Sequence, residues 1–515
     1  MASEKTTRLV FQSAFAASLG GLLFGFDTAV ISGTTEALKS VFSLNDWQLG
    51  FTVSSALIGT ILGAATIQFP ANQFGRKPTL AMIALLYLVS AIGSAFPLLG
   101  GLVPETWGWH SFIFFRFLGG IGVGGASVVS PLYTAEIAPP KRRGFLVALT
   151  QFNIVFGILL AYVSNYIIAR LSLGATEWRW MFGVEAVPAA LFLLAVLGNP
   201  ESPRWLVARG RFDQARALLA KLLPDASEVD VEFSAIKESL ETERQGAVKD
   251  RLFCWRYRKP ILLAFAIAAF NQLSGINTIM YYAPKVFAMT GASKSASYFF
   301  PMIIGLTNFV ATTIAIFCID KFGRKKLMYA GSIGYILSLA FVGAIFTLYS
   351  SEFDAAIKRL DAEAQAPATA ALEPGVTVDD AAADDASATA DASTPDVVAT
   401  ASAVPKFGVV GVLVGLMVFI ASHAFGQGAC IWVFISEIFP NSVRAQGNAL
   451  GCFTHWIMNA IISGLFPPLL AIFGPALIFF SFAVFMVGQL LWVAFVMPET
   501  KHVPLEDMMK KLGVE

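Results

Sequence analysis

The chain has 515 residues, of which 56% are hydrophobic and 14% are charged, and its formal net charge is +1. Soluble domains carry about 25% charged residues, so the composition excludes an ordinary soluble protein and predicts a chain that crosses a membrane many times. The small net charge does not indicate a nucleic-acid partner. The four cysteines form no C-x-x-C motif, and we expect neither a disulfide framework nor a metal site.

Apolar runs of about 20 residues predict membrane-spanning helices. Six such runs precede a polar segment at 201–259 and six follow it. The predicted spans are 9–33, 47–70, 79–100, 110–133, 144–170, 179–199, 260–288, 296–319, 326–349, 407–435, 446–472 and 475–497. The expected fold is therefore an all-α membrane protein made of two six-helix bundles.

Basic residues predict the orientation of these helices, because loops rich in lysine and arginine stay on the cytoplasmic side. Such residues follow the second predicted span at 76–77, the fourth at 141–143 and the eighth at 321–326. The loop between the third and fourth spans has none. We therefore expect a multi-pass protein of the cell membrane with both termini and the 201–259 segment in the cytoplasm.

Composition also divides the chain into domains. Residues 1–200 are expected to form the first bundle, 201–259 a linker of amphipathic cytoplasmic helices, 260–500 the second bundle and 501–515 a cytoplasmic tail. The segment 351–405 is rich in alanine, aspartate and threonine and has a single aromatic residue. It cannot bury enough surface to fold, so we expect a disordered outer loop, and an insertion without a role is the simplest interpretation.

The two halves repeat each other. FGRKPTL at 74–80 returns as FGRKKLM at 322–328, AEIAPPKRRG at 135–144 as SEIFPNSVRAQG at 436–447, and PES at 200–202 as PET at 498–500. A duplicated six-helix unit is typical of transporters, whose site lies near the middle of the membrane between the halves.

Motifs for nucleotides and for catalysis are missing from the sequence. There is no GxxxxGK[ST] loop, which argues against ATP as the energy source. GIGVGG at 120–125 lies inside a predicted span, where small residues favour close helix packing. We expect no cofactor, and no constellation of residues indicates an enzyme.

Two charged side chains interrupt the predicted spans of the first half. Asp27 lies in the first span and Arg116 in the fourth. A charge at the centre of a bilayer costs about 2.5–3.5 kcal/mol on insertion scales, so each is expected to have a partner or a task. An arginine beside Asp27 would offset the cost of both charges and hold the carboxylate ionised.

Amides and aromatic rings in the other spans suit a sugar. The hydroxyls of a sugar both donate and accept hydrogen bonds, which matches side-chain amides, and an aromatic face packs on the ring. Hydrogen bonding between helices is the alternative role of each amide. The candidate side chains are Gln151, Asn271, Gln272, Asn277, Asn308, Trp432, His455, Trp456 and Asn459.

Three of these amides cannot share one face of an unbroken helix, because they occupy positions 271, 272 and 277. The sequence Ser-Gly-Ile at 274–276 would let the helix bend between them. We therefore expect a break in the seventh predicted span.

The repeated motifs, together with PESPRWL at 200–206, NQLSGINTIMYYAP at 271–284 and PETK at 498–501, occur in this order over 9–507. The set resembles the sugar porter family of the major facilitator superfamily, and most of all its bacterial proton-coupled pentose and hexose symporters of the D-xylose type. The resemblance implies two bundles, alternating access and a monosaccharide substrate.

The resemblance also implies roles for the buried charges. Arg116 would face Asp27, and protonation of the acid would cancel their attraction and free the two helices to move. Related uniporters carry a neutral amide at position 27, which favours proton coupling here. A static buried salt bridge is the alternative. Glu185 would assist this pair or the cytoplasmic gate, or would only join helices by a hydrogen bond.

By the same resemblance, Gln151, Gln272, Asn277 and Trp432 would contact the sugar, and Phe24 and Tyr281 would line the site. The sequence departs from the family pattern at three positions. Asn271 replaces a glutamine, His455 replaces an amide, and Ile158 replaces a glutamine found in xylose symporters. The sugar therefore stays open between a pentose and a hexose.

A cytoplasmic charge network is implied as well, with a role as a latch of the outward-open state. Its expected pairs are Glu136 with Arg143 and Glu437 with Arg444. These charges could also serve only to fix the topology, and we expect both roles. The expected members are Arg76, Glu136, Arg143, Asp320, Arg324, Glu437 and Arg444.

The sequence thus predicts a monomeric carrier for proton-coupled uptake of a monosaccharide. A facilitative sugar uniporter with the same site is the first alternative. A transporter-like sugar sensor is the second, and the short stretch after PETKHVP at 498–504 argues against it because a sensor needs a signalling tail.

Overall fold

The computed structural model describes residues 2–139, 142–223, 226–245, 251–359, 406–440, 442–501, 503 and 505–514. Within these ranges the regular structure is helical and no strand occurs. Eleven helical segments are long and apolar enough to span a membrane. The last of them, α21 (Arg444–Phe495), has 52 residues and turns at Gly474, where φ is 72°. At about 1.5 Å per residue it is more than twice as long as the ~30 Å hydrocarbon core, so it supplies two spans, and the predicted twelve are confirmed.

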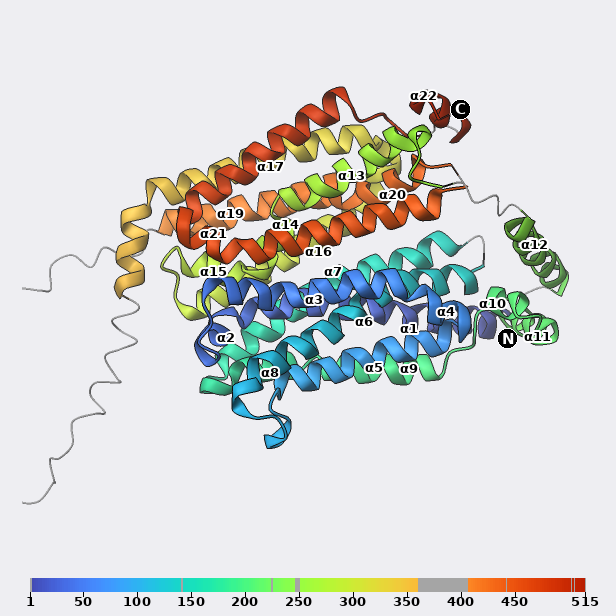
Figure 1. Ribbon diagram of the computed structural model, residues 1–515, viewed down its shortest axis with the longest axis horizontal. Coiled ribbons are helices and arrows are strands. Elements are labelled where there is room, and N and C mark those ends of the chain that lie inside the picture. The colour runs from blue at the N-terminus through green and yellow to red at the C-terminus, as the bar shows by residue number, and fades with distance from the viewer. Residues whose placement is uncertain are drawn as a thin grey trace, which may run out of the picture.

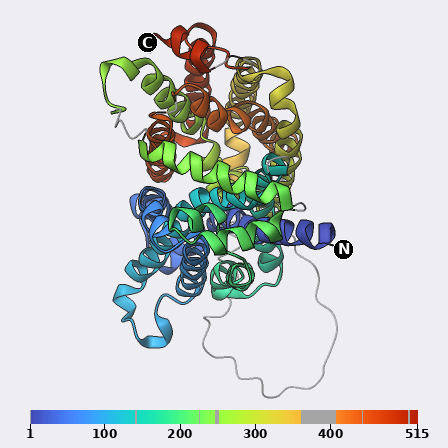
Figure 2. The same cartoon turned by 90° about the vertical axis from the view of Figure 1, so that its right-hand side faces the viewer.

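The N-terminal half holds the first six spans (Figures 1 and 2). The short helix α2 (Thr35–Val41) lies between the first two spans, and α4 (Gln68–Gln73) continues the second span beyond α3. The spans are α1 (Ala2–Val30), α3 (Asp46–Thr66), α5 (Arg76–Ala95), α6 (Gly108–Ile137), α7 (Arg143–Arg170) and the pair α8 (Glu177–Gly183) and α9 (Ala186–Leu197).

The C-terminal half repeats this plan with more breaks. Its first span is divided at Gly275, which has a left-handed φ of 79°, so the predicted break is confirmed. The span before α21 is divided by a π-helical turn at Ala424–Gly428, which the sequence pattern did not predict. The elements before α21 are α13 (Arg258–Leu273), α14 (Ile276–Tyr281), α15 (Ala283–Ala288), α16 (Lys294–Phe322), α17 (Arg324–Leu348), α19 (Lys406–His423) and α20 (Ala429–Glu437).

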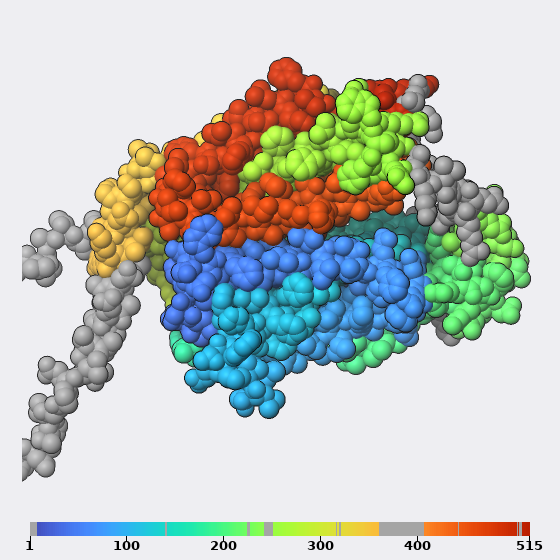
Figure 3. All heavy atoms as spheres, in the orientation of Figure 1, coloured from blue at the N-terminus to red at the C-terminus, as the bar shows by residue number. Residues whose placement is uncertain are grey.

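The halves form two layers that meet along a seam running the length of the molecule (Figure 3). The linker helices α10 (Pro203–Ala208), α11 (Phe212–Leu222) and α12 (Ala226–Gln245) lie at the same end as both chain ends and the C-terminal α22 (Leu505–Leu512) (Figure 1). We name this end the basic end and the opposite one, which carries α2 and α15, the far end.

Small residues allow the helices within each half to touch. A Cβ atom on Gly25 of α1 would lie 1.9 Å from the carbonyl oxygen of Ile154 in α7. A Cβ on Gly120 of α6 would lie equally close to the carbonyl oxygen of Ala56 in α3. No side chain fits at either position, so the prediction that GIGVGG at 120–125 serves helix packing is confirmed.

Polar contacts join the two halves at and toward the far end. They come from the outer parts of spans in both halves, which closes this end of the interface. They include Ser54 Oγ to Ala460 O (2.9 Å), the Tyr162 hydroxyl to Met280 O (2.8 Å), the Tyr298 hydroxyl to Gly33 O (2.7 Å), Lys285 to Glu36 (2.9 Å) and Lys294 to Glu177 (2.8 Å).

The linker and the acidic segment differ in how they fold. Trp205, Leu219 and Phe233 of α10–α12 are buried in one apolar cluster with side chains of the N-terminal half. Residues 350–359 are helical, and Phe353 is 2% exposed against Phe346. The expectation that 351–405 is disordered throughout is therefore wrong for its first residues, because the single aromatic finds an apolar partner. Residues 360–405 lie outside the described ranges.

Candidate functional site

The two buried charges of the N-terminal half lie together. Arg116 Nη1 donates to Asp27 Oδ1 at 2.5 Å and Nη2 donates to Oδ2 at 3.3 Å. The side chains are 3% and 4% exposed, and the guanidinium lies 5.2 Å from the ring centre of Phe182. Either charge alone would be expensive at this depth, and the pairing offsets the cost.

A third ionisable group lies close enough to this pair for the charges to interact. Glu185, between α8 and α9, is 1% exposed and its Oε1 has no hydrogen-bond partner among the described residues. The same holds for the hydroxyl of Tyr87, for Ser90 Oγ and for Arg116 Nε. Buried polar atoms nearly always have a partner in protein or water, so this group of atoms indicates a place that ordered water can fill.

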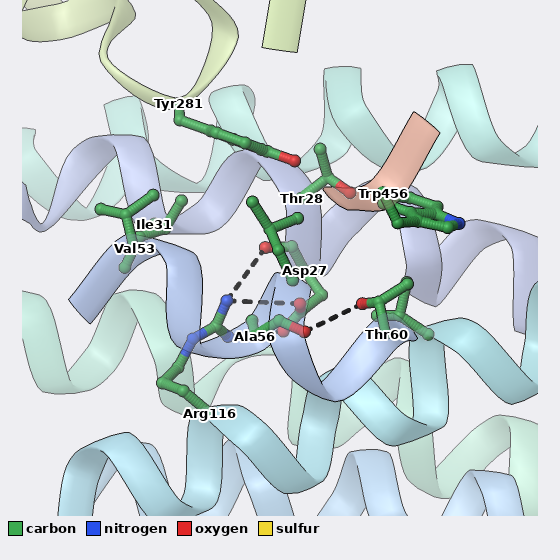
Figure 4. A pocket seen from close by; sticks show the side chains of 11 residues that line it. Asp27, Thr28, Ile31, Val53, Ala56, Thr60, Arg116, Tyr281 and Trp456 are labelled. Carbon is green, nitrogen blue, oxygen red and sulfur yellow. Dashed lines mark hydrogen bonds and ion pairs between the residues drawn. The ribbon is translucent and has the colours of Figure 1, made fainter. Parts of the chain in front are cut away.

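A small cavity of about 20 Å³ opens beside Asp27 and has room for about one water molecule. Figure 4 shows Arg116 pointing at Asp27 within it. Thr60 lines it from α3, and Tyr281 and Trp456 reach it from the C-terminal half. The charge pair therefore faces the interface between the halves and not the lipid.

Aromatic rings continue the wall of this cavity. Trp456 lies 5.6 Å from Phe24 and 5.0 Å from His455, measured between ring centres. His455 in turn lies 5.2 Å from Trp432, and Gln272 Nε2 lies 3.2 Å from its ring nitrogens. Two side chains, Trp456 and His455, thus lie between the acid and Gln272, the first of the predicted sugar amides.

The break between α13 and α14 collects three amides. Asn277 Nδ2 donates to Gln272 Oε1 at 3.1 Å, and Gln272 Nε2 donates to Asn271 Oδ1 at 2.9 Å. Gln272 and Asn271 are 2% and 3% exposed, whereas Asn277 is half-buried. The break brings position 277 back to position 272, which an unbroken helix would not do.

Other predicted sugar contacts are placed differently. Asn459 is fully buried and donates to the Tyr281 hydroxyl at 3.1 Å, so it joins α21 to α14. Asn308 accepts a hydrogen bond from Thr312 of its own helix at 3.4 Å, and Gln151 is exposed on α7.

In the described part of the chain, no group of histidine, cysteine and carboxylate side chains is arranged to hold a metal.

The predicted charge network lies at the basic end, with different pairs. Arg76 binds Glu136 at 2.8 Å, and Arg324 Nη2 binds Glu437 at 3.0 Å. The expected pairs Glu136–Arg143 and Glu437–Arg444 are wrong, because each glutamate ends its helix beside the arginine of the repeated G-R-K loop.

Arg143 and Arg444 begin the following helices and make other contacts. Arg143 lies 3.7 Å from Glu232 of the linker helix α12, and Arg444 Nε donates to Phe439 O at 3.3 Å. The side chain of Asp320 lies outside the described residues.

Two glutamates complete the network, although the sequence pattern gave them no role. Glu201 Oε1 accepts from the backbone N–H of Arg76 at 2.8 Å, and Glu499 Oε1 accepts from that of Arg324 at 3.1 Å. Each carboxylate thereby caps the N-terminus of α5 or α17, where negative charge is favoured. The signal that could have found them is their repetition in PES and PET.

The two capping glutamates differ in electrostatics. Burial raises the pKa of Glu201, because the N–H groups that it binds offset this only in part. Burial also acts on the more exposed Glu499, but there four backbone N–H groups outweigh it and lower the pKa. An acid with a raised pKa in the folded state destabilises the fold when ionised, and an acid with a lowered pKa stabilises it.

We therefore expect opposite effects of the two matched substitutions. Glu499→Gln should lower the thermal unfolding midpoint at pH 7, and the loss should fade as the pH falls below the ordinary glutamate value of about 4.3. Glu201→Gln should leave the midpoint unchanged or raised at pH 7. As the pH falls, this difference should disappear at a higher pH than the Glu499→Gln effect does, because the pKa of Glu201 is raised. Midpoints measured in detergent from pH 7 to about pH 3 test this, and an equal loss for both variants at pH 7 would contradict it.

Comparison with known proteins adds the family. The family model described as "Sugar (and other) transporter" matches residues 13–360 and 393–512. The D-xylose-proton symporter of Escherichia coli (strain K12) is 34% identical over 541 residues, covering 99% of this chain and 96% of that protein. The glucose transport protein of Synechocystis sp. is 33% identical over 516 residues, covering 98% of each.

A solved structure agrees with the fold. The xylose transporter XylE from E. coli in an inward open conformation superposes with a TM-score of 0.76 at 32% identity, covering 98% of this chain and 99% of that chain. Sequence, fold and the repeated motifs at the basic end lead to the same assignment. The chain belongs to the sugar transporter family, the sugar porters of the major facilitator superfamily.

Proposed function

We propose that the protein takes up a monosaccharide together with protons, by alternating access to a site between its two halves. The substrate class is a pentose or a hexose, because the similar proteins named above are a D-xylose-proton symporter and a glucose transport protein. The protein acts as a monomer in the cell membrane. The basic end faces the cytoplasm, since basic loops stay on that side.

The observation that carries the proposal is the shared wall of the two subsites. Trp456 lines the cavity at Asp27 and also packs against His455, which meets Gln272. The proton acceptor and the sugar-binding amides are therefore joined through two packed side chains, Trp456 and His455, which give a physical route for coupling between the subsites. This is the arrangement that coupling of two substrates requires.

Proton coupling then follows from the charge pair. Water entering the cavity separates Asp27 from Arg116, and the acid takes a proton. Protonation removes the attraction between α1 and α6, and α1 carries Phe24 against Trp456. Glu185 is the second carboxylate of this group, since the charge of Arg116 also acts on it.

Alternating access follows from the contacts between the halves. The far end is closed here by bonds such as Tyr162 to Met280 and Tyr298 to Gly33. Trp432, at the amide group, remains 40% exposed. We assign this structure to the inward-facing state, in which the Arg76–Glu136 and Arg324–Glu437 pairs each stay within one half. These charges would latch the basic end only when the two halves close there, in the outward-open state.

A competition experiment tests the proposal. Labelled D-xylose or D-glucose uptake is measured in cells that lack their own carriers, with a panel of unlabelled pentoses and hexoses, with and without a protonophore. We expect one sugar class to compete and uphill uptake to stop with the protonophore. Uptake that ignores the protonophore would leave a facilitative uniporter, and no competition by any sugar would overturn the proposal.

Asn277→Ala should raise the KM for the sugar about tenfold, because one lost hydrogen bond leaves a sugar hydroxyl or Gln272 unpaired, at about 1–3 kcal/mol. The maximal rate should change much less. Asn153→Ala is the control, since this buried amide bonds to Ser18 in the N-terminal half, away from the sugar amides. A similar KM for both variants would remove Asn277 from the sugar site.

A further inference from the structure

A row of hydrogen-bonded side chains leads from the sugar amides into the C-terminal half. Asn271 Nδ2 donates to Gln427 Oε1 at 3.3 Å, and Gln427 Nε2 donates to Gln489 Oε1 at 2.7 Å. Gln489 Nε2 then donates to Ser332 Oγ at 2.8 Å. The amide chain, as we name it, consists of Asn277, Gln272, Asn271, Gln427, Gln489 and Ser332.

Every bond of the amide chain runs in one direction. Asn277 donates first, and each following amide accepts through its oxygen from the residue nearer the interface and donates through its nitrogen to the next one. The last hydroxyl, Ser332 Oγ, donates to the carbonyl oxygen of Met328 at 2.7 Å. If one amide group rotated by half a turn, its oxygen would face the oxygen of the next side chain and the hydrogen bond between them would be lost. The backbone carbonyl of Met328 therefore determines, through Ser332, how the amide groups nearer the interface are oriented.

The backbone is shaped to make this chain possible. Gln427 lies in the π-helical turn Ala424–Gly428, and such turns are frequent at functional sites. Gly426 of the turn faces Gly331 of α17, where a Cβ would lie 2.8 Å from the Gly426 Cα. This close approach brings α17, and with it Ser332, next to the turn.

The inner members of the chain cannot touch a sugar. Gln427, Gln489 and Ser332 are each 0% exposed. Apolar side chains would fill the same space inside a membrane protein without any polar group to satisfy. The polar character of these three side chains therefore needs a reason other than contact with the substrate.

We propose that Gln427 and Gln489 are positioning residues for sugar recognition, which act through Asn271 to fix whether Gln272 and Asn277 offer an oxygen or an N–H to the sugar. The inference rests on the proposed function. Sugars of one class differ in the direction of single hydroxyls, so amides held in one orientation discriminate between them. Amides free to turn over would lose both affinity and selectivity.

Gln489→Leu tests the proposal, because Gln489 is separated from Gln272 by two further side chains. Affinities of the purified full-length protein for D-xylose and for D-glucose are measured by calorimetry or by the quenching of its tryptophan fluorescence. We expect the variant to bind the preferred sugar about three- to tenfold more weakly, by loss of about one hydrogen bond. The ratio of the two affinities should move toward one.

A double-variant cycle separates positioning from general stability. Once Asn277→Ala has removed the outer end of the chain, adding Gln489→Leu should cost much less than it does in the wild type. Asn165→Ala is the control, since among the described residues this buried amide bonds to a backbone carbonyl, that of Val30, and not to the amide chain. Its effect should add to that of Asn277→Ala without coupling.

The outcomes are distinct. If Gln489→Leu does not fold, Ser332→Ala removes only the last acceptor and should shift affinity and selectivity in the same direction by a smaller factor. Unchanged affinity and selectivity in a folded chain variant, or effects that simply add in the cycle, would overturn the inference while leaving the proposed function intact. A wild-type protein that binds neither these two sugars nor any other pentose or hexose of the competition panel would overturn the proposed function itself, and the inference with it.

Discussion

Asp27→Asn is expected to abolish accumulation of the sugar against its gradient while sugar exchange across the membrane continues. One proton driven by 100 mV supplies about 2.3 kcal/mol, which is enough for more than tenfold accumulation at about 1.4 kcal/mol per tenfold. Without a group that takes the proton, this energy cannot reach the sugar. The internal concentration should then rise only to the external one.

Asparagine suits this test because it changes little else. Its oxygen keeps an acceptor for Arg116 Nη1, which now bonds to Asp27 Oδ1 at 2.5 Å. The carboxylate of Glu185 remains close enough to act on the arginine. The fold and the sugar subsite should therefore persist, and counterflow of labelled sugar in vesicles should stay within a few-fold of the wild type.

Uptake in energised vesicles and counterflow in de-energised vesicles provide the two readouts. Asp46→Asn is the matched control, because this carboxylate forms an ion pair with Lys39 at the far end and is 31% exposed. It should lose neither activity. Uphill uptake that survives in Asp27→Asn would remove Asp27 from the coupling mechanism and transfer the role to Glu185.

Most of the fold could be predicted from the sequence because membrane spans are long and apolar. The break at Gly275 was also predictable, since three amides at 271, 272 and 277 needed it. The π-helical turn at Ala424–Gly428 was not, because no proline or run of small polar residues marks it. The turn accompanies a tertiary contact, the close approach of Gly426 to Gly331 of α17, and such a contact cannot be seen in the sequence of one span.

The charge pair of the site was accessible to sequence reasoning for the same physical reason. A buried Asp27 needs a cation, and Arg116 was the charge available in a neighbouring span. Pairing at the basic end was harder, because Arg76 and Arg143 are both plausible partners of Glu136 and only the direction of the helix ends decides between them.

The amide chain shows a different kind of limit. Gln427 and Gln489 are visible as polar residues in apolar spans, so the rule that selected Gln272 could have selected them too. What the sequence could not supply was their order in space, because α13, the π-helical turn Ala424–Gly428 and α21 meet only in the folded protein. A rule based on residue type identifies the participants, and the packing decides which of them reach the interface.

Arg116→Met is expected to lower stability by about 3–5 kcal/mol, the usual effect of removing one partner of a buried ion pair. The loss should exceed that of Asp27→Asn, because Arg116 is the cation for two carboxylates. Asp27 is bonded to it, and the charges of both Asp27 and Arg116 act on Glu185. Thermal unfolding in detergent measures the difference, and Lys285→Met, which breaks an ion pair with the exposed Glu36, should cost no more than about 1 kcal/mol.

Stepwise neutralisation then separates stability from coupling. Adding Asp27→Asn to Arg116→Met should recover part of the lost stability, and adding Glu185→Gln should recover most of the rest, since each step removes one carboxylate that lacks a cation. Equal losses for Asp27→Asn and Arg116→Met would mean that Glu185 does not share the arginine. A triple variant that is stable and still exchanges sugar, but accumulates none, would show that the fold does not need these three charges and that the chain keeps them to move protons.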